Sequence, residues 1–108
     1  MPGFNTIFEL APALIAVSNS LAVETVFDVY QQIIAVDLLA PIALTQAVLP
    51  RMVKAGRGDI VAIASVAGIV GAPLRSAYSA AKHGLIGYHD SVRAETAQLG
   101  IRVLVVAP

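Results

Sequence analysis

Two short apolar runs without polar alternation place the strongest constraint on how this chain folds. Ile60–Ala64 and Ile101–Ala107 are almost uniformly apolar, which is typical of parallel strands covered by helices on both faces. Between them, Ala77–Leu99 is predicted as a helix, with Ser76 as its N-cap and Gly100 at the left-handed position that ends it. The order strand, helix, strand predicts a right-handed crossover within a parallel sheet.

The N-terminal half of the chain extends this pattern. Ala13–Val17 is predicted as a further short buried strand, and Glu24–Lys54 as one long helix. Within that helix, Ile33–Pro50 is apolar nearly all round, and such a helix is normally buried on both sides. Pro41 is expected to kink or divide the helix, because proline lacks a backbone donor and clashes with the preceding turn. Pro50 predicts a second break.

Composition limits the size, partners and location of the protein. A chain of 108 residues allows one small domain, and the absence of cysteine excludes a disulfide scaffold and a thiol nucleophile. Seven Lys and Arg balance seven Asp and Glu, and this zero net charge disfavours nucleic-acid binding. The longest charge-free stretches, Leu10–Val23 and Ile60–Leu74, have 14 and 15 residues. A membrane-spanning helix needs about 20, so no transmembrane segment is expected. A cytoplasmic location is predicted, and a membrane-associated parent protein is the alternative.

Three polar residues are expected to meet at the functional edge of the sheet. Tyr78 and Lys82 are four residues apart on one helix face, which places their Cβ atoms about 5–6 Å apart. Ser65 follows a predicted strand, at the carboxyl edge where open α/β sheets bind ligands. An ammonium beside a phenol stabilises the phenolate, so the pair suits proton exchange with a carbonyl oxygen that Ser65 holds. A tyrosine and a lysine at this spacing also occur by chance on many helices.

Several segments together resemble the short-chain dehydrogenases/reductases. The likeness covers about Ser20–Pro108 and includes the spacing of 13 residues from Ser65 to Tyr78. It implies an α/β fold with a partial Rossmann-like, doubly wound parallel sheet of about three strands and two long helices. Residues 1–108 would form a single incomplete domain of this kind. The matching segments, in chain order, are Asp37–Pro41, Val61–Gly68, Tyr78–Lys82 and Ile101–Pro108.

The resemblance implies an NAD- or NADP-dependent interconversion of an alcohol and a ketone or aldehyde. It implies Tyr78 as the general acid/base, and Lys82 as the residue that holds the nicotinamide ribose. Ser65 would orient the substrate carbonyl, and Pro108 would open the loop that contacts the nicotinamide. Asp37 stands where the family has an asparagine, whose backbone carbonyl holds a water in a proton relay to the lysine.

The sequence also departs from the family. It has no glycine-rich turn of the kind that seats a pyrophosphate, and Leu14–Val17 stands where the family has an Asn-Asn-Ala-Gly turn. The alternative function is therefore a truncated, catalytically inactive fragment that binds a partner subunit or has no function. The resemblance implies a homo-oligomer formed through the two long helices. Equally, the rest of the fold could cover their apolar surface.

Other conspicuous residues receive simpler interpretations. Gly56–Asp59 contains an Arg-Gly-Asp tripeptide, but a turn into the next strand is expected rather than an adhesion site. His83 and His89 are expected at the surface or at a hinge, because no carboxylates stand at metal-ligand spacing around them. Arg75 lies close to the predicted site, where it contacts either substrate or solvent.

Overall fold

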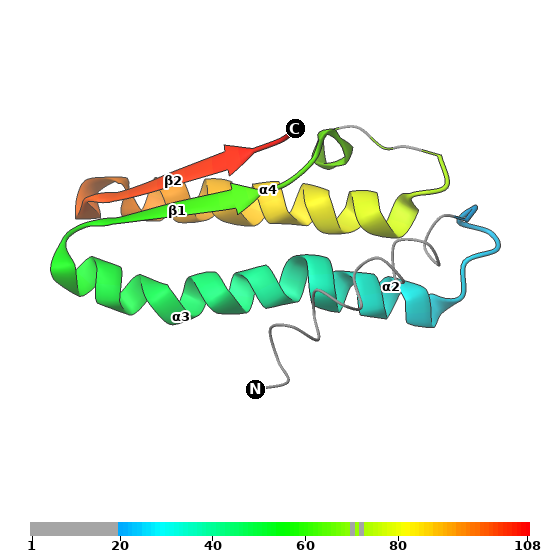
Figure 1. Cartoon of the computed structure of the whole chain (residues 1–108), viewed down its shortest axis with the longest axis horizontal. Helices are drawn as coiled ribbons and strands as arrows, with labels where there is room; N and C mark the ends of the chain where they lie inside the picture. The colour runs from blue at the N-terminus through cyan, green and yellow to red at the C-terminus, as the bar shows by residue number, and fades with distance from the viewer. Residues whose placement is uncertain (1–19, 70, 72) are drawn as a thin grey trace.

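The computed structural model describes residues 20–69, 71 and 73–108 of the chain. Two parallel strands and two long helical regions make up an α/β architecture (Figure 1); the α/β class and the two long helices are as predicted. The strand expected at Ala13–Val17 lies outside the described residues. The long elements are α2 (Phe27–Ile34), α3 (Ala40–Ala55), β1 (Gly58–Ile63), α4 (Ser76–Thr96) and β2 (Ile101–Val106). Three short helical segments join them: η1 (Ala35–Leu39), η2 (Val66–Gly68) and η3 (Ala97–Leu99).

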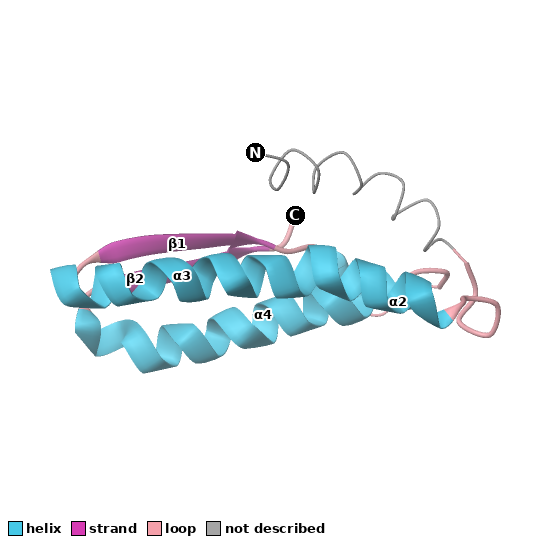
Figure 2. Ribbon diagram, turned by 90° about the horizontal axis from the view of Figure 1, so that it is seen from below, coloured by secondary structure: helices cyan, strands magenta, loops and turns pink. Residues whose placement is uncertain are grey.

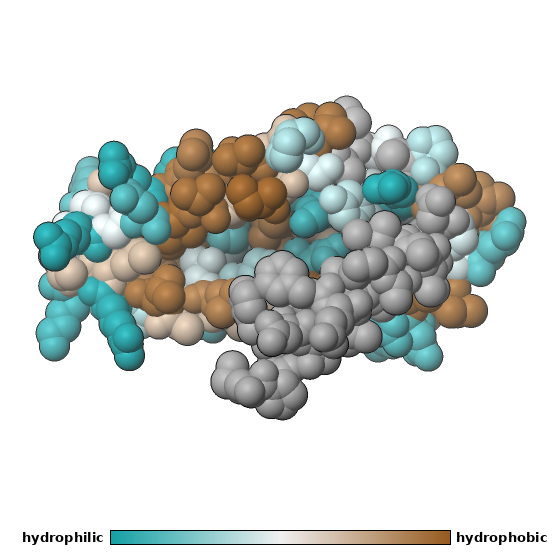
Figure 3. Space-filling model, viewed as in Figure 1, coloured by the Kyte–Doolittle hydropathy of each residue, from teal (hydrophilic) through white to brown (hydrophobic). Residues whose placement is uncertain are grey.

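The two strands pair in parallel, and α4 forms the crossover between them. The register runs from Gly58 opposite Ile101 to Ile63 opposite Val106. Within the described residues all helices lie on one side of the sheet (Figure 2). Burial therefore alternates along each strand, and the expectation that helices cover both faces is wrong for this part of the chain. The uncovered side chains form an apolar surface over the strands (Figure 3); Val61, Ile63 and Leu104 are 58%, 59% and 58% exposed.

The long helix predicted for the first half of the chain is present, with an irregular turn ahead of Pro41. Because Pro41 has no N–H, it cannot give the Asp37 carbonyl its usual α-helical hydrogen bond. The five residues of η1 form a π-helical turn at this place, and the helix continues into α3. Pro50 lies inside α3, so the predicted second break is wrong.

The apolar residues of α3 are largely uncovered. Thr45 is the buried residue of this helix, whereas Leu44, Val48 and Val53 are 57%, 40% and 41% exposed. The expectation of burial on both sides is therefore wrong for the described residues. The helical region Phe27–Ala55 contains an 18-residue window with a mean hydropathy of 1.9. It is long and apolar enough to cross a membrane by length and composition, a test that core helices of soluble proteins also pass. Both the cytoplasmic location and the absence of a transmembrane segment stay predictions.

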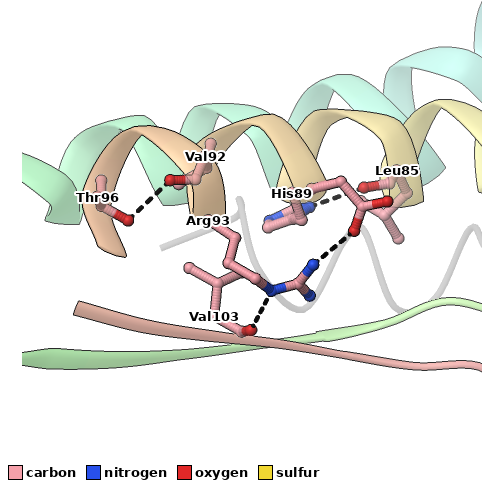
Figure 4. A network of polar contacts seen from close by, with 7 residues as sticks. Leu85, His89, Val92, Arg93, Thr96 and Val103 are labelled. Carbon is pink, nitrogen blue, oxygen red and sulfur yellow. Dashed lines mark hydrogen bonds and ion pairs between the residues drawn. The ribbon is translucent and has the colours of Figure 1, made fainter. Parts of the chain in front are cut away.

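In contrast, α4 packs closely on both α2 and the sheet. Arg93 strengthens the contact with the sheet by donating to the Val103 carbonyl at 2.8 Å (Figure 4). Its guanidinium also donates to Asp90 of the same helix at 2.8 Å. Gly100 has φ +82°, the left-handed conformation expected after the helix. One apolar cluster contains Val29, Ile33, Ala77 and Ala81, and the other contains Ile60, Val92, Ile101 and Val103.

Candidate active site

Ser65 and Pro108 are fixed at the carboxyl edge of the sheet. The Ala64 N–H donates to the Val106 carbonyl at 2.7 Å, and the Val66 N–H donates to the Pro108 carbonyl at 3.3 Å. These bonds continue the parallel pairing past the ends of β1 and β2. Since Ser65 lies between the two donors, its half-buried side chain starts from a well-defined backbone position.

Tyr78 and Lys82 lie together on the first half of α4. The Lys82 Nζ atom is 5.4 Å from the centroid of the Tyr78 ring, and both side chains are half-buried. A second cation approaches the same ring, because the Arg75 Cζ atom is also 5.4 Å from its centroid. The shared helix face predicted for Tyr78 and Lys82 is therefore present, and Arg75 joins them. The structure does not test their catalytic roles.

Gly68 lies in the loop after β1 and approaches the backbone of α4 closely. A Cβ atom at Gly68 would lie 2.8 Å from the Lys82 carbonyl oxygen and 2.7 Å from the Ile86 Cδ1 atom. The Gly68 N–H also donates to the Ser65 carbonyl at 2.8 Å. The serine loop is thus held against the turn of α4 that carries Lys82. Sequence reasoning included Gly68 only as the last residue of the family-like segment Val61–Gly68, although a small residue between two predicted site residues is a usable signal.

The start of α4 is anchored by a residue that sequence reasoning missed. The Tyr30 and Ser76 hydroxyls form a hydrogen bond of 2.8 Å, which joins α2 to the first residue of α4. Ser76 is therefore not the N-cap; Arg75 holds that position, without a side-chain capping bond. Leu74, just before it, has φ +65°, a left-handed conformation that costs a leucine about 1–3 kcal/mol. This turn directs Arg75 and Tyr78 to the same place.

Asp37 faces α4 from η1. Its Oδ2 atom is buried and has no hydrogen-bond partner in the described part of the chain. Burial raises the pKa of Asp37, and the Lys82 ammonium partly opposes this rise. A cavity of about 260 Å³ lies between α3, β1 and α4; its polar lining residues are Asp37, Thr45, Lys82 and His89. Asp37 and Lys82 therefore line the same cavity.

His89 is a buried core residue, and its expected place at the surface or a hinge is wrong. It is 1% exposed, and both ring nitrogens form hydrogen bonds. The Leu85 carbonyl lies 2.9 Å from Nδ1 (Figure 4), and since a carbonyl only accepts, Nδ1 carries the proton. Nε2 lies 3.0 Å from the Thr45 hydroxyl oxygen, and the two form a second hydrogen bond. His83, by comparison, is exposed.

Comparisons with known proteins agree with this geometry. The family model described as short chain dehydrogenase matches residues 14–108. Dehydrogenase/reductase SDR family member 7B of Danio rerio is 45% identical over 85 residues, which are 79% of this chain and 28% of that protein. Dehydrogenase/reductase SDR family protein 7-like of Drosophila melanogaster is 45% identical over 84 residues, 78% of this chain and 26% of that protein.

Solved structures show the same arrangement. 4-Hydroxyisoleucine dehydrogenase complexed with NADH superposes with a TM-score of 0.79 and 35% identity, covering 83% of this chain and 40% of that one. A short-chain dehydrogenase from Streptomyces avermitilis superposes with a TM-score of 0.80 and 34% identity, over 82% of this chain and 33% of that one.

The parallel strands, their one-sided helices and the polar groups at the carboxyl edge define a Rossmann-like α/β protein. The chain belongs to the short-chain dehydrogenase/reductase family. It spans 26–28% of the length of the curated relatives compared above.

Proposed function

We propose that the chain carries the proton-transfer part of an NAD(P)-dependent oxidoreductase that interconverts an alcohol and a ketone or aldehyde. The observation that carries this proposal is the Lys82 ammonium beside the Tyr78 ring, at the sheet edge where Ser65 and Pro108 are fixed. Family membership supports the cofactor class, as does the NADH complexed with 4-hydroxyisoleucine dehydrogenase, a structural neighbour of this chain.

The described residues fit the nicotinamide end of such a cofactor. Tyr78 and Lys82 offer hydroxyl and ammonium donors for ribose hydroxyls, and Pro108 lies at the same edge as Ser65. Residues 1–108 contain no glycine-rich turn for the pyrophosphate. When bound, the cofactor supplies or accepts the hydride, and the side chains of this chain supply the remaining chemistry.

In the direction of reduction, each side chain has one task. Ser65 donates a hydrogen bond to the substrate carbonyl oxygen and so opposes the build-up of negative charge on it. Tyr78 gives its hydroxyl proton to that oxygen, a step worth about 10²–10⁴ in rate. Lys82 stabilises the phenolate left on Tyr78 through its positive charge. Oxidation of the alcohol uses the same groups in reverse.

Asp37 belongs to this proposal as a member of the proton path behind Lys82. The path implied by the family uses a backbone carbonyl, which aspartate retains. An ionised Asp37 carboxylate would attract the Lys82 ammonium and weaken the effect of that ammonium on Tyr78. We therefore expect Asp37→Asn to leave turnover equal or higher, and a large loss of turnover would contradict this role.

A second candidate function is association without catalysis. Exposed apolar side chains along α3 and on the open face of the sheet favour it, because large apolar patches mark interfaces. The contact would join two copies of the chain through the long helices. In this case the chain binds neither NADH nor NADPH, and its mass in solution depends on concentration.

The deciding experiment has two arms. First, NADH and NADPH are added to residues 1–108, and nucleotide fluorescence and the unfolding temperature are recorded. Second, residues 20–108 replace the matching segment of the Danio rerio relative, and carbonyl-dependent oxidation of the nucleotide is measured. We expect turnover in the chimera and a loss of about 10²–10⁴ with Tyr78→Phe. Tyr88→Phe, a matched change on the same helix, should leave turnover intact. A chimera that folds and binds nucleotide but turns over no carbonyl substrate contradicts the proposal.

A further inference from the structure

Arg75 is the cation of the candidate site that the proposed reaction leaves without a task. Its Cζ atom is 5.4 Å from the Tyr78 ring centroid, as close as the Lys82 Nζ atom. Its side chain is half-buried, in the short connection between the serine loop and α4. Lys82 has a place in the proton transfer, whereas the chemistry of a ketone or alcohol requires no guanidinium.

The half-buried Arg75 differs from the two arginines that form ion pairs within the described residues. Arg93 pairs with Asp90 at 2.8 Å, and Arg102 pairs with Asp59 at 2.7 Å. Within the described residues, no carboxylate forms an ion pair with Arg75. Asp37, the acidic group of the site, faces Lys82 instead, and burial raises its pKa. In the part of the chain that the structure describes, the half-buried Arg75 guanidinium therefore has no acidic partner, and it lies close to the Tyr78 ring.

The most direct use of such a group is to bind an anion carried by the substrate. A guanidinium presents a planar set of donors that matches the two oxygens of a carboxylate. Partial burial strengthens this attraction relative to that of a fully hydrated cation. A small oxo-acid would be held at two points: its carbonyl oxygen by Tyr78 and Ser65, and its carboxylate by Arg75. A neutral ketone would be held only at its carbonyl oxygen.

We propose that Arg75 is a specificity residue that binds a substrate carboxylate, so that the site selects oxo-acids and hydroxy-acids over neutral ketones and alcohols. The substrate part of this inference rests on the proposed oxidoreductase function, whereas the anion site itself can be measured without cofactor. Arg75 takes no part in the proton transfer.

The test compares an oxo-acid with its neutral amide, because the two probes share the reacting carbonyl. Levulinate and levulinamide are titrated into nitrogen-labelled chain at low salt, and the signals of the Arg75 guanidinium and the Tyr78 amide are followed by NMR. We expect levulinate to bind at least about tenfold more tightly than levulinamide, a typical return for one charge-assisted pair. Raised salt should reduce the difference.

Three variants decide the assignment. Arg75→Gln should abolish the preference for the acid, and Arg75→Lys should keep part of it, since lysine retains the charge but not the planar donors. Arg51→Gln removes the same charge from an exposed position on α3 and should change nothing. Dispersed amide signals show that each variant is folded.

The inference is overturned if the acid and the amide bind equally, if neither shifts the Arg75 or Tyr78 signals, or if Arg75→Gln keeps the preference. If the chain prefers levulinate to levulinamide but the chimera shows no turnover, the anion site is supported and the proposed oxidoreductase function is contradicted. If the chimera turns over the acid and the amide equally well, the oxidoreductase function is supported and the role of Arg75 is contradicted.

Discussion

The more apolar of the two long helical regions is the less buried one. Helix α3 is rich in large apolar side chains, yet Thr45 is its buried residue and Leu44 is 57% exposed. Helix α4 carries charged and small residues but buries seven positions, among them Ala77 and Ala81 at 1% and 0% exposure. Small side chains let α4 approach α2 and the sheet closely, and that approach brings Tyr78 and Lys82 to the sheet edge.

The contrast teaches that apolar content measures how much surface a helix can bury, not how much it has buried. The packing surface of α4 is covered within this chain, because α2, β1 and β2 all pack against it. α3 still exposes surface that fits a further layer or a second copy. The site therefore depends on α4 and its contacts, whereas α3 carries exposed apolar surface.

The largest expected effect is the difference in stability between a substitution in the buried contact of α2 with α4 and one on the exposed surface of α3. Ile33→Ala empties a position that is 1% exposed and packs on Ala77 and Ala81, which costs about 2–5 kcal/mol of unfolding free energy. Leu44→Ala, at 57% exposure, should change that free energy by no more than about 0.5 kcal/mol. Urea unfolding of both variants provides the comparison.

Equal losses for the two variants would show that the surface of α3 is covered in solution. Repeating the unfolding at several protein concentrations shows whether a second copy of the chain buries this surface. A midpoint that rises with concentration in the native chain, and not in Leu44→Ala, indicates a second copy.

This contrast also marks where sequence reasoning stops. Uniformly apolar strands and the Gly100 stop predicted β1, α4 and β2 within a few residues, because these signals are local. Their burial was predicted wrongly, since coverage of the second face depends on segments that the apolar pattern does not specify. The π turn of η1 was foreseen only as a disturbance at Pro41.

A smaller effect is expected where η2 meets α4. Gly68→Ala places a methyl group 2.8 Å from the Lys82 carbonyl oxygen, and backbone atoms cannot turn aside as a flexible side chain can. We expect a loss of about 1–3 kcal/mol in unfolding free energy and a displaced serine loop. In the chimera, turnover should fall more than nucleotide binding, because Ser65 moves away from Tyr78.

Gly87→Ala is the matched control on α4. No atom of the described residues lies within 4 Å of a Cβ there, so the change should stabilise the helix by up to about 1 kcal/mol. A loss of unfolding free energy in Gly68→Ala and a gain in Gly87→Ala would support the close contact of η2 with α4. A neutral Gly68→Ala would show that the serine loop is not held there.

The site was predictable to the extent that one helix carries it. The spacing of Tyr78 and Lys82 guarantees a shared face, and the likeness to the family placed Ser65 and Pro108 at one edge. Arg75 in contact with the Tyr78 ring, Tyr30 bonded to Ser76, and the burial of His89 all depend on tertiary contacts. No periodicity in the sequence encodes those contacts.

The smallest effect concerns Asp37, which lies on the seam between the two helical regions. Its pKa is raised in the folded chain, above the ordinary value of 3.8, because burial penalises the carboxylate more than Lys82 stabilises it. Folding therefore favours the protonated form. The resulting stability is fully present below pH 3.8 and is lost as the pH rises through the folded pKa.

Asp37→Asn removes this dependence and should raise the urea midpoint at neutral pH, with the gain disappearing on acidification to pH 3.8. Asp28→Asn, the same change at an exposed position in the first turn of α2, should bring no such gain. If Asp37→Asn is instead less stable at neutral pH, the attraction of the carboxylate to the Lys82 ammonium outweighs the cost of burial. In that case the Asp37 carboxylate stabilises the contact between η1 and α4. The stabilising contacts of α4 then include the helical region of η1 and α3, whose apolar side chains are otherwise largely exposed.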